Sequence, residues 1–154
     1  MERVYSILYL EDERWQIEGT TTTVLRKEFN TNVCIIKSVI EARDFLKREH
    51  FDLLIFDIMV YSKRAMTFEN SALVLVQELI KGDFKPINDE NTPIIFASAF
   101  LDITITRTET DGSVVAKQVS DIIKDMGIEN PIFLFKPFSK EELIEKVKEA
   151  IHHE

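Results

Sequence analysis

The sequence is poor in cysteine, histidine and clustered positive charge, and it has no long apolar run. Cys34 is the only cysteine, so neither an internal disulfide nor a multi-cysteine metal site can form. Asp and Glu number 27 against 19 Lys and Arg, and the net charge of −8 disfavours binding to nucleic acid or to an anionic membrane surface. No stretch approaches the roughly 18 apolar residues of a membrane span. The apolar stretch in the opening MERVYSILYLEDE is too short for a signal peptide. We therefore expect a cytoplasmic protein that binds a protein or a small molecule.

The chain also lacks repeats, low-complexity tracts and linkers rich in Gly, Ser or Pro. At 154 residues and 45% hydrophobic content it is long enough and apolar enough for one sizeable core. The sequence therefore predicts a single domain over residues 1–154.

Five short apolar runs have the length and the β-branched or aromatic composition of buried strands. They are residues 4–10, 32–37, 52–57, 93–98 and 131–135. Segments with helical periodicity alternate with them, at residues 14–28, 38–48, 69–81, 114–126 and 139–152. This alternation predicts an α/β fold in which helices cover both faces of a doubly wound, five-stranded parallel sheet with right-handed crossovers.

Two connections in this pattern are long. Residues 58–68 and 99–113 exceed the roughly two to six residues that are usual between a strand and the following helix. Within the second, ITITRTET at 103–110 alternates in a way that fits an added strand or hairpin arm as well as a loop. Residues 82–92 (GDFKPINDENT) are predicted to be a solvated loop.

Polar side chains follow four of the five predicted strands. Because the carboxyl ends of parallel strands lie at one edge of the sheet, where doubly wound proteins bind ligands, we expect these side chains to be neighbours. They are Glu11, Asp12, Glu13, Asp57, Ser98 and Lys136. Taken singly, each has an ordinary structural explanation, such as an acid near a helix start, a hydroxyl at a strand end or a Lys-Pro turn. Their common position is what favours a functional site.

This set of side chains predicts a divalent metal. Close carboxylates repel one another unless a cation lies between them, and Mg²⁺ suits an open site of oxygen ligands. Zinc is not expected, because His50, His152 and His153 lie away from the strand ends. A central carboxylate such as Asp57 can attack a phosphoryl group and form an acyl phosphate, while the metal and Lys136 neutralise the phosphoryl oxygens.

Four motifs together resemble the receiver domains of two-component response regulators, the CheY-like family. They are ILYLEDE (7–13), LLIFDIM (53–59), PIIFASA (93–99) and FLFKPFS (133–139). The resemblance covers essentially the whole chain and implies a flavodoxin-like sheet with strand order 2-1-3-4-5. It also implies a histidine kinase or a histidine phosphotransfer protein as phosphodonor, and a downstream protein that the sequence does not identify.

The resemblance implies a role for each matching residue. Asp57 corresponds to the phosphoacceptor and Lys136 to the ammonium that contacts the phosphate. Mg²⁺ would be held by Asp12 and Asp57, by Glu11 as the companion acid, and by the main-chain carbonyl of Met59.

A second group corresponds to the conformational switch of the family. Ser98 matches the hydroxyl that turns toward the phosphoryl group, and Ala99 the small residue that leaves room for it. Phe133 falls at the position of the aromatic switch residue, although a core Phe is an equal interpretation. Pro137 is expected to follow a cis peptide bond.

The sequence departs from the family in two places. Tyr61 stands where the family usually has Pro, and the long connections suggest insertions near 60–68 and 99–113. One hypothesis is that residues 61–68 form a lid over the phosphorylation site. Because residues 152–154 directly follow the last predicted helix, we expect either a stand-alone regulator or a receiver cut from a longer protein.

Two other functions remain open at this point. A degenerate receiver would keep the fold as a binding module without phosphorylation. A phosphatase of the haloacid dehalogenase type would need a second Asp two residues after Asp57, where the chain has Met59. We therefore expect a phosphoacceptor rather than an enzyme with turnover.

Overall fold

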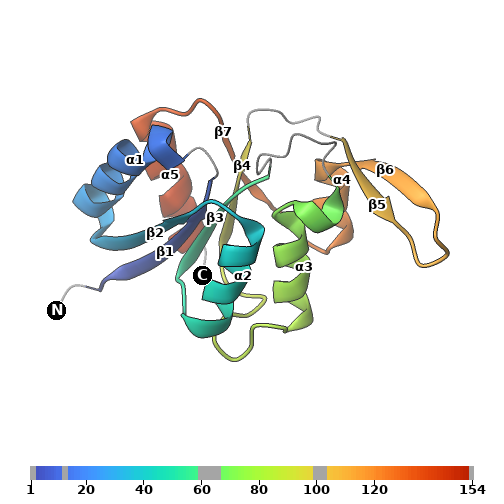
Figure 1. The fold of residues 1–154 in the computed structure, drawn as a ribbon. Helices are drawn as coiled ribbons and strands as arrows, with labels where there is room; N and C mark the ends of the chain where they lie inside the picture. The colour runs from blue at the N-terminus through green and yellow to red at the C-terminus, as the bar shows by residue number, and fades with distance from the viewer. Residues whose placement is uncertain (1–2, 12–13, 59–66, 99–103, 153–154) are drawn as a thin grey trace.

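A five-stranded parallel sheet forms the centre of the protein, in a computed structural model that describes residues 3–11, 14–58, 67–98 and 104–152. Helices α1 and α5 cover one face, and α2, α3 and α4 cover the other (Figure 1). The strands of this sheet, in spatial order, are β2 (Thr31–Ile36), β1 (Tyr5–Leu10), β3 (Leu53–Asp57), β4 (Ile94–Ser98) and β7 (Ile132–Phe135). The helices are α1 (Arg14–Phe29), α2 (Val39–Arg48), α3 (Leu73–Lys81), α4 (Val119–Asp125) and α5 (Lys140–Ile151). The predicted fold class and strand order 2-1-3-4-5 are confirmed, with β7 as the fifth strand of the sheet.

The apolar strands are explained by burial on both faces of the sheet. In β1, Ile7 and Tyr9 pack toward α1 and α5, whereas Leu8 and Leu10 pack toward α2 and α3. Successive strand residues point to opposite faces, so a strand that is covered on both sides needs an apolar residue at nearly every position.

Local signals fix the ends of several helices. The Ser38 side chain accepts a hydrogen bond from the Glu41 amide at the start of α2. Ser139 and Glu142 form a reciprocal capping box at the start of α5. Helix α3 ends at Lys81 and is capped by Gly82, whose φ of 90° lies in the left-handed region that favours glycine.

The predicted helix over residues 114–126 is wrong in its first part. Residues Val114–Gln118 form strand β6, which pairs antiparallel with β5 (Thr104–Thr108), and α4 begins only at Val119. The β-branched start of this segment pairs with the inserted TITRT sequence, and that pairing overrides its helical periodicity. Of the alternatives for 103–110, the hairpin arm is the one that forms.

The segment predicted as a helix over 69–81 is also divided. A short 3-10 turn, η1 (Phe68–Asn70), precedes α3, which starts at Leu73. Ser71 separates the two, because its hydroxyl donates to the Phe68 carbonyl and accepts from the Leu73 amide.

The connection 82–92 is more than the solvated loop that its polar sequence suggests. Phe84 and Asn88 are buried, with 2% and 1% of their surfaces exposed. Phe84 joins the core cluster beneath α2 and α3. The Asn88 side chain hydrogen-bonds to the backbone of the α2–β3 connection, so these two loops support each other.

The amino end of the sheet is closed by an ion pair at Asp52. Its carboxylate accepts hydrogen bonds from the Ser6 amide (2.9 Å) and the Arg3 guanidinium (2.8 Å). Burial acts to raise the pKa of Asp52, but these hydrogen bonds and the positive charge of Arg3 hold the pKa below its ordinary value. The carboxylate is therefore more stable in the folded chain than in the unfolded one.

Replacing Asp52 with Asn is expected to lower the free energy of unfolding by about 1 kcal/mol at neutral pH, because a charge-assisted hydrogen bond is lost. A depressed folded-state pKa stabilises the protein above the ordinary carboxyl pKa of about 4, and this stabilisation is lost as the pH falls through the folded-state value. Urea unfolding of both proteins at several pH values measures the difference. It should shrink at acid pH; a difference that stays constant would contradict a charge effect. The exposed Asp44→Asn, which loses only a surface pair with Arg48, is the control.

Within the described part of the chain, no helix is both long and apolar enough to cross a membrane.

Candidate functional site

The carboxyl edge of the sheet brings the predicted polar residues together. Strand β3 ends at Asp57 and β4 at Ser98, while Glu11 directly follows β1 and Lys136 directly follows β7. Backbone hydrogen bonds extend the sheet past the strand ends, from the Glu11 amide to the Ile36 carbonyl and from the Lys136 amide to the Ser98 carbonyl, both 2.8 Å. The side chains at this edge therefore start from well-fixed backbone positions.

An ammonium lies between two buried carboxylates at the centre of this edge. Lys136 Nζ donates to Asp57 Oδ2 at 2.7 Å and to Glu11 Oε2. Glu11 and Asp57 are 1% and 3% exposed, whereas the Lys136 side chain keeps 22% of its surface exposed. The cluster thus places two buried carboxyl groups around one ammonium, and it reaches solvent through Lys136.

Electrostatics at the cluster favour an additional cation. Burial and hydrogen bonding with Glu11 raise the pKa of Asp57 to about 8, although Lys136 acts in the opposite direction. Burial would lower the pKa of Lys136, but attraction and hydrogen bonds to Asp57 and Glu11 raise it above its ordinary value. Lys136 is therefore held in its charged form, whereas burial disfavours the ionised form of Asp57. A further positive charge nearby would stabilise the ionised carboxylate.

Tyr9 is a feature of this region that the sequence reading missed. Its side chain is fully buried, and among the described residues its hydroxyl has no hydrogen-bond partner. Burial, with the nearby charges of Glu11 and Asp57, raises the pKa of this hydroxyl above its ordinary value. The only signal in the sequence was a Tyr inside the apolar run ILYL, where an aliphatic residue would leave no polar atom unpaired.

Ser98 and Phe133 lie on neighbouring strands beside the cluster. Ser98 is buried at the end of β4 and pairs in register with Phe135 of β7. Phe133 is only partly buried, and its ring lies 5.9 Å from that of Phe96 and 6.0 Å from that of Phe135. The Lys136–Pro137 peptide is cis, as the resemblance implied.

Several predicted site residues lie outside the described part of the chain. These are Asp12, Glu13, Met59 and Ala99. Among the described residues, no three acidic, His or Cys side chains gather as a possible metal site. The buried pair of Glu11 and Asp57, with its hard oxygen donors, nevertheless fits a hard cation such as Mg²⁺.

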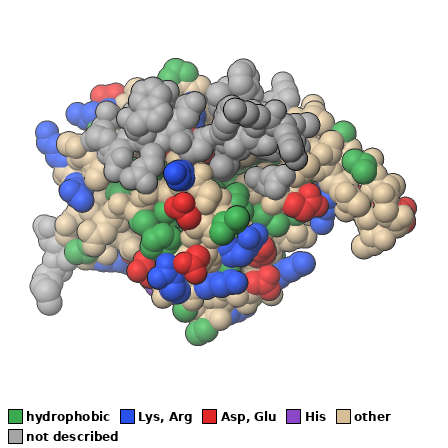
Figure 2. Space-filling model, viewed as in Figure 1, with side chains coloured by type: hydrophobic (Ala, Val, Ile, Leu, Met, Phe, Trp, Pro, Cys, Tyr) green, Lys and Arg blue, Asp and Glu red, His purple; other side chains and the backbone are tan. Residues whose placement is uncertain are grey.

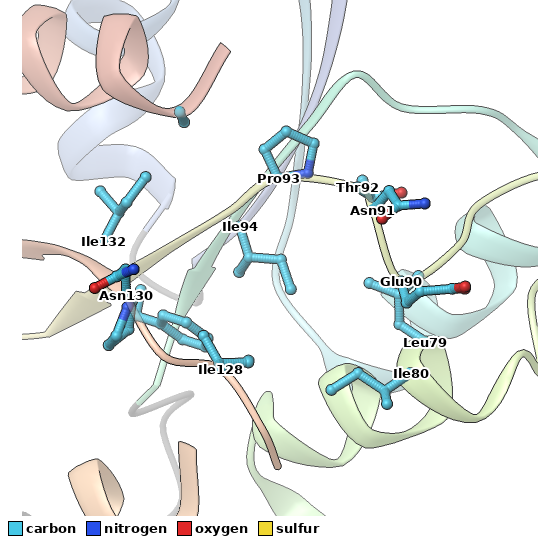
Figure 3. Close-up of a pocket in the computed structure, with 13 residues that line it drawn as sticks. Leu79, Ile80, Glu90, Asn91, Thr92, Pro93, Ile94, Ile128, Asn130 and Ile132 are labelled. Atoms are coloured by element: carbon cyan, nitrogen blue, oxygen red, sulfur yellow. The ribbon is translucent and has the colours of Figure 1, made fainter. Parts of the chain in front are cut away.

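A separate pocket lies at the opposite edge of the sheet. Its volume is about 330 Å³, and its lining includes Pro93 just before β4, Ile94 at the start of β4 and Ile132 at the start of β7 (Figure 3). Ile80 of α3 closes one side. Because this pocket adjoins the amino ends of the strands, it is not part of the Asp57 cluster.

Comparison with known proteins supports the fold. No protein-family model matches the sequence, and no curated protein matches it. Among solved structures, a CheY-like receiver domain protein from Methanospirillum hungatei is 15% identical with a TM-score of 0.64, covering 98% of this chain and 96% of its own. The receiver domain of a sensor histidine kinase from Pseudomonas aeruginosa, which has a magnesium ion in its active-site cleft, is 18% identical with a TM-score of 0.65, covering 97% and 99%. The HemR receiver domain from Leptospira biflexa is 16% identical with a TM-score of 0.64, covering 96% and 94%.

These similarities extend over nearly the full length of both chains in each comparison. The protein therefore has the CheY-like fold of response regulator receiver domains.

Proposed function

We propose that this protein is a phosphorylatable receiver domain that accepts a phosphoryl group on Asp57 from a histidine kinase or a histidine phosphotransfer protein. One observation carries the proposal: the Lys136 ammonium bridges the buried carboxylates of Asp57 and Glu11 at the carboxyl edge of a CheY-like sheet. An isolated buried acid would be a poor nucleophile and a structural liability, whereas this acid has a fixed cation beside it.

In the proposed reaction, a carboxylate oxygen of Asp57 attacks the phosphorus atom of the donor. The bond between phosphorus and the donor's nitrogen or oxygen breaks, its electron pair leaves with the donor, and an acyl phosphate remains on Asp57. Lys136 moves from its ion pair with Asp57 to the phosphoryl oxygens, where it neutralises developing charge. Mg²⁺ supplies further positive charge there when bound, held by Glu11 and Asp57 with the predicted ligands Asp12 and the Met59 carbonyl.

We further propose that Ser98 reports the phosphorylated state. Its position at the end of β4, next to the strand that carries Phe133 and leads into Lys136, supports a hydroxyl that turns toward the phosphoryl group. Phe133 has no hydroxyl, so any movement that follows is stabilised by packing against Phe96 and Phe135 rather than by a hydrogen bond.

Mass spectrometry after incubation with Mg²⁺ and acetyl phosphate tests the proposal against the two alternatives. A labile gain of one phosphoryl group supports the receiver. Sustained hydrolysis of phosphate esters would instead support a phosphatase with turnover. If neither result is observed, the protein is a binding module that keeps only the fold.

Mg²⁺ is expected to stabilise the folded protein. A ligand that binds only the folded state at about ten times its dissociation constant adds about 1.4 kcal/mol, or roughly 3 to 5 °C in the unfolding midpoint. Thermal unfolding with and without Mg²⁺, at matched ionic strength with NaCl, measures this shift. It should be clearly smaller in Asp57→Asn, which removes one carboxylate from the pair. An equal shift of the unfolding midpoint in both proteins would show that the metal binds elsewhere.

A further inference from the structure

The inserted hairpin of β5 and β6 extends away from the body of the protein (Figure 1). The two strands pair antiparallel from Thr104 opposite Gln118 to Thr108 opposite Val114. A tight turn with Gly112 at φ 87° connects them. The hairpin is therefore a regular two-stranded sheet with two outer edges, one along β5 and one along β6.

The hydrogen-bonding phase of the hairpin follows from its turn. The Glu109 amide donates to the Ser113 carbonyl at 2.8 Å, so these residues are a hydrogen-bonded pair. Since such pairs alternate with non-hydrogen-bonded ones, Thr106 and Ala116 form a non-hydrogen-bonded pair. The backbone N–H and C=O groups of Ala116 and of its alternate neighbours in β6 therefore point away from β5.

The outer edge of β5 is already occupied. Thr67 forms a parallel bridge to Thr106, and the Arg107 guanidinium lies 4.6 Å from the centre of the Phe68 ring. Ile105, fully buried, anchors the same strand in the core. These contacts fix the hairpin to the body along β5.

In the part of the chain that the structure describes, the outer edge of β6 has no such cover. No strand pairs with it among the described residues, so it presents the N–H and C=O groups of Val114 and Ala116 together with the N–H of Gln118. The Gln118 carbonyl is at the N-cap of α4 and serves the first turn of that helix. An uncovered edge of this kind is a template for another strand.

The outward face of the hairpin carries no charge, although 30% of the residues in the chain are charged. It is formed by Thr104, Thr106, Thr108, Val114, Ala116 and Gln118. All are exposed except the half-buried Thr106, and Val114 keeps 67% of its surface exposed. On the side seen in Figure 2, the hairpin at the right is mostly uncharged, in contrast to the mixed acidic and basic side chains over the body.

The lysine of β6 does not protect this edge strand from pairing. A lysine on an edge strand normally discourages pairing, and β6 contains Lys117. Its ammonium donates to Asp125 of α4 at 3.2 Å, on the side of the hairpin that faces the body. The one charge in β6 is thus drawn toward α4 and compensated.

We propose that two copies of this chain associate by pairing β6 with β6 in antiparallel orientation, about a two-fold axis beside Ala116. In this arrangement Ala116 faces Ala116 of the second copy, Val114 faces Gln118, and Val115 faces Lys117, so no like charges meet. About four backbone hydrogen bonds form between the outward groups. The result is a continuous four-stranded sheet with the order β5-β6-β6-β5 and one uncharged face, and its formation does not depend on phosphorylation.

Sedimentation velocity on the full chain, without Mg²⁺ or phosphodonor, tests this pairing. Because strand pairing alone gives an interface at the small end of the known range, a dissociation constant of about 10 to 100 µM is expected. Ala116→Pro removes the central N–H donor but no bond of the β5–β6 ladder, and it should weaken association at least about tenfold. Thr108→Pro, also at a non-hydrogen-bonded position but on the other edge, should leave association unchanged. A protein that stays monomeric to about 500 µM, or equal effects of both proline variants, would overturn the proposal.

Disulfide crosslinking tests the register independently, in a Cys34→Ser background. Two Ala116→Cys chains would have Cα atoms about 5.5 Å apart, within disulfide range, and should form a covalent dimer under mild oxidation. Thr104→Cys lies on the same face but on the other strand, at least three strand spacings or roughly 14 Å from its counterpart, and should not crosslink. Equal crosslinking at both positions would contradict the β6–β6 register.

Discussion

Asp57→Asn is expected to abolish the phosphoryl mass gain that wild-type protein shows with acetyl phosphate and Mg²⁺. The amide nitrogen and oxygen of Asn are too weakly nucleophilic to form the acyl phosphate. The fold should survive, because Asn keeps the shape of the side chain and removes one of two buried carboxyl groups that share a single ammonium. Intact-mass spectrometry of both proteins, with circular dichroism to confirm folding, measures the outcome.

The matched control is Asp52→Asn, at the other end of the same strand. Asp52 precedes β3 and pairs with Arg3, whereas Asp57 ends β3 at the Lys136 cluster. The Asp52 variant should therefore gain the phosphoryl group at the wild-type rate at a temperature where it is fully folded. The modification should also be released by hydroxylamine, as an acyl phosphate is. A hydroxylamine-stable gain, or one that persists in Asp57→Asn, would point to a hydroxyl acceptor and contradict the proposed function.

Lys136 connects this chemistry to the rest of the fold. It is the residue through which β7 reaches both Asp57 of β3 and Glu11 after β1. Three separate strands therefore meet in one ion cluster, and phosphorylation would change the partners of Lys136 first. The hairpin is linked to the same region from two sides, because β5 follows β4 along the chain and contacts Thr67 and Phe68, which follow β3.

The strand ends could be predicted from the sequence for a physical reason. Strands buried on both faces are mostly apolar, so the charged residue or hydroxyl that follows an apolar run marks the carboxyl end of a strand. A parallel sheet then places those ends at one edge. The sequence alone therefore places Glu11, Asp57, Ser98 and Lys136 at this edge, and their chemical roles remain predictions that the mass measurements address.

Features that depend on contacts between residues distant in the sequence could not be predicted in the same way. The segment VVAKQ has the periodicity of a helix start, and only the presence of TITRT across a tight turn makes it a strand. Asn88 lies in a polar stretch whose composition is that of a solvated loop. Nothing in the local sequence indicates that its amide is buried, because the groups it binds are backbone atoms of residues about 40 positions earlier.

Asn88→Ala is expected to lower the free energy of unfolding by about 3 kcal/mol. The Asn88 side-chain oxygen accepts from the Phe51 amide at 3.0 Å, and its nitrogen donates to the carbonyls of Leu46 and Glu49, both at 2.8 Å. Alanine removes all three bonds and leaves the Phe51 amide buried without its acceptor, at the point where α2 passes into β3. Urea unfolding followed by fluorescence or circular dichroism gives the difference, and an unchanged dependence on urea would show that the unfolding reaction itself is the same.

Asn91→Ala provides the control, since Asn91 is an exposed residue of the same connection. Its loss should change stability by no more than about 0.5 kcal/mol. Asn88→Asp sharpens the test, because it keeps the acceptor for Phe51 but turns a carboxylate oxygen toward the two carbonyls that Asn88 donates to. Repulsion should make this variant at least as unstable as Asn88→Ala at neutral pH, and acidification should partly restore it by giving the carboxyl a proton to donate. If Asn88→Ala proved as stable as Asn91→Ala, the 82–92 connection would not hold the α2–β3 loop in solution.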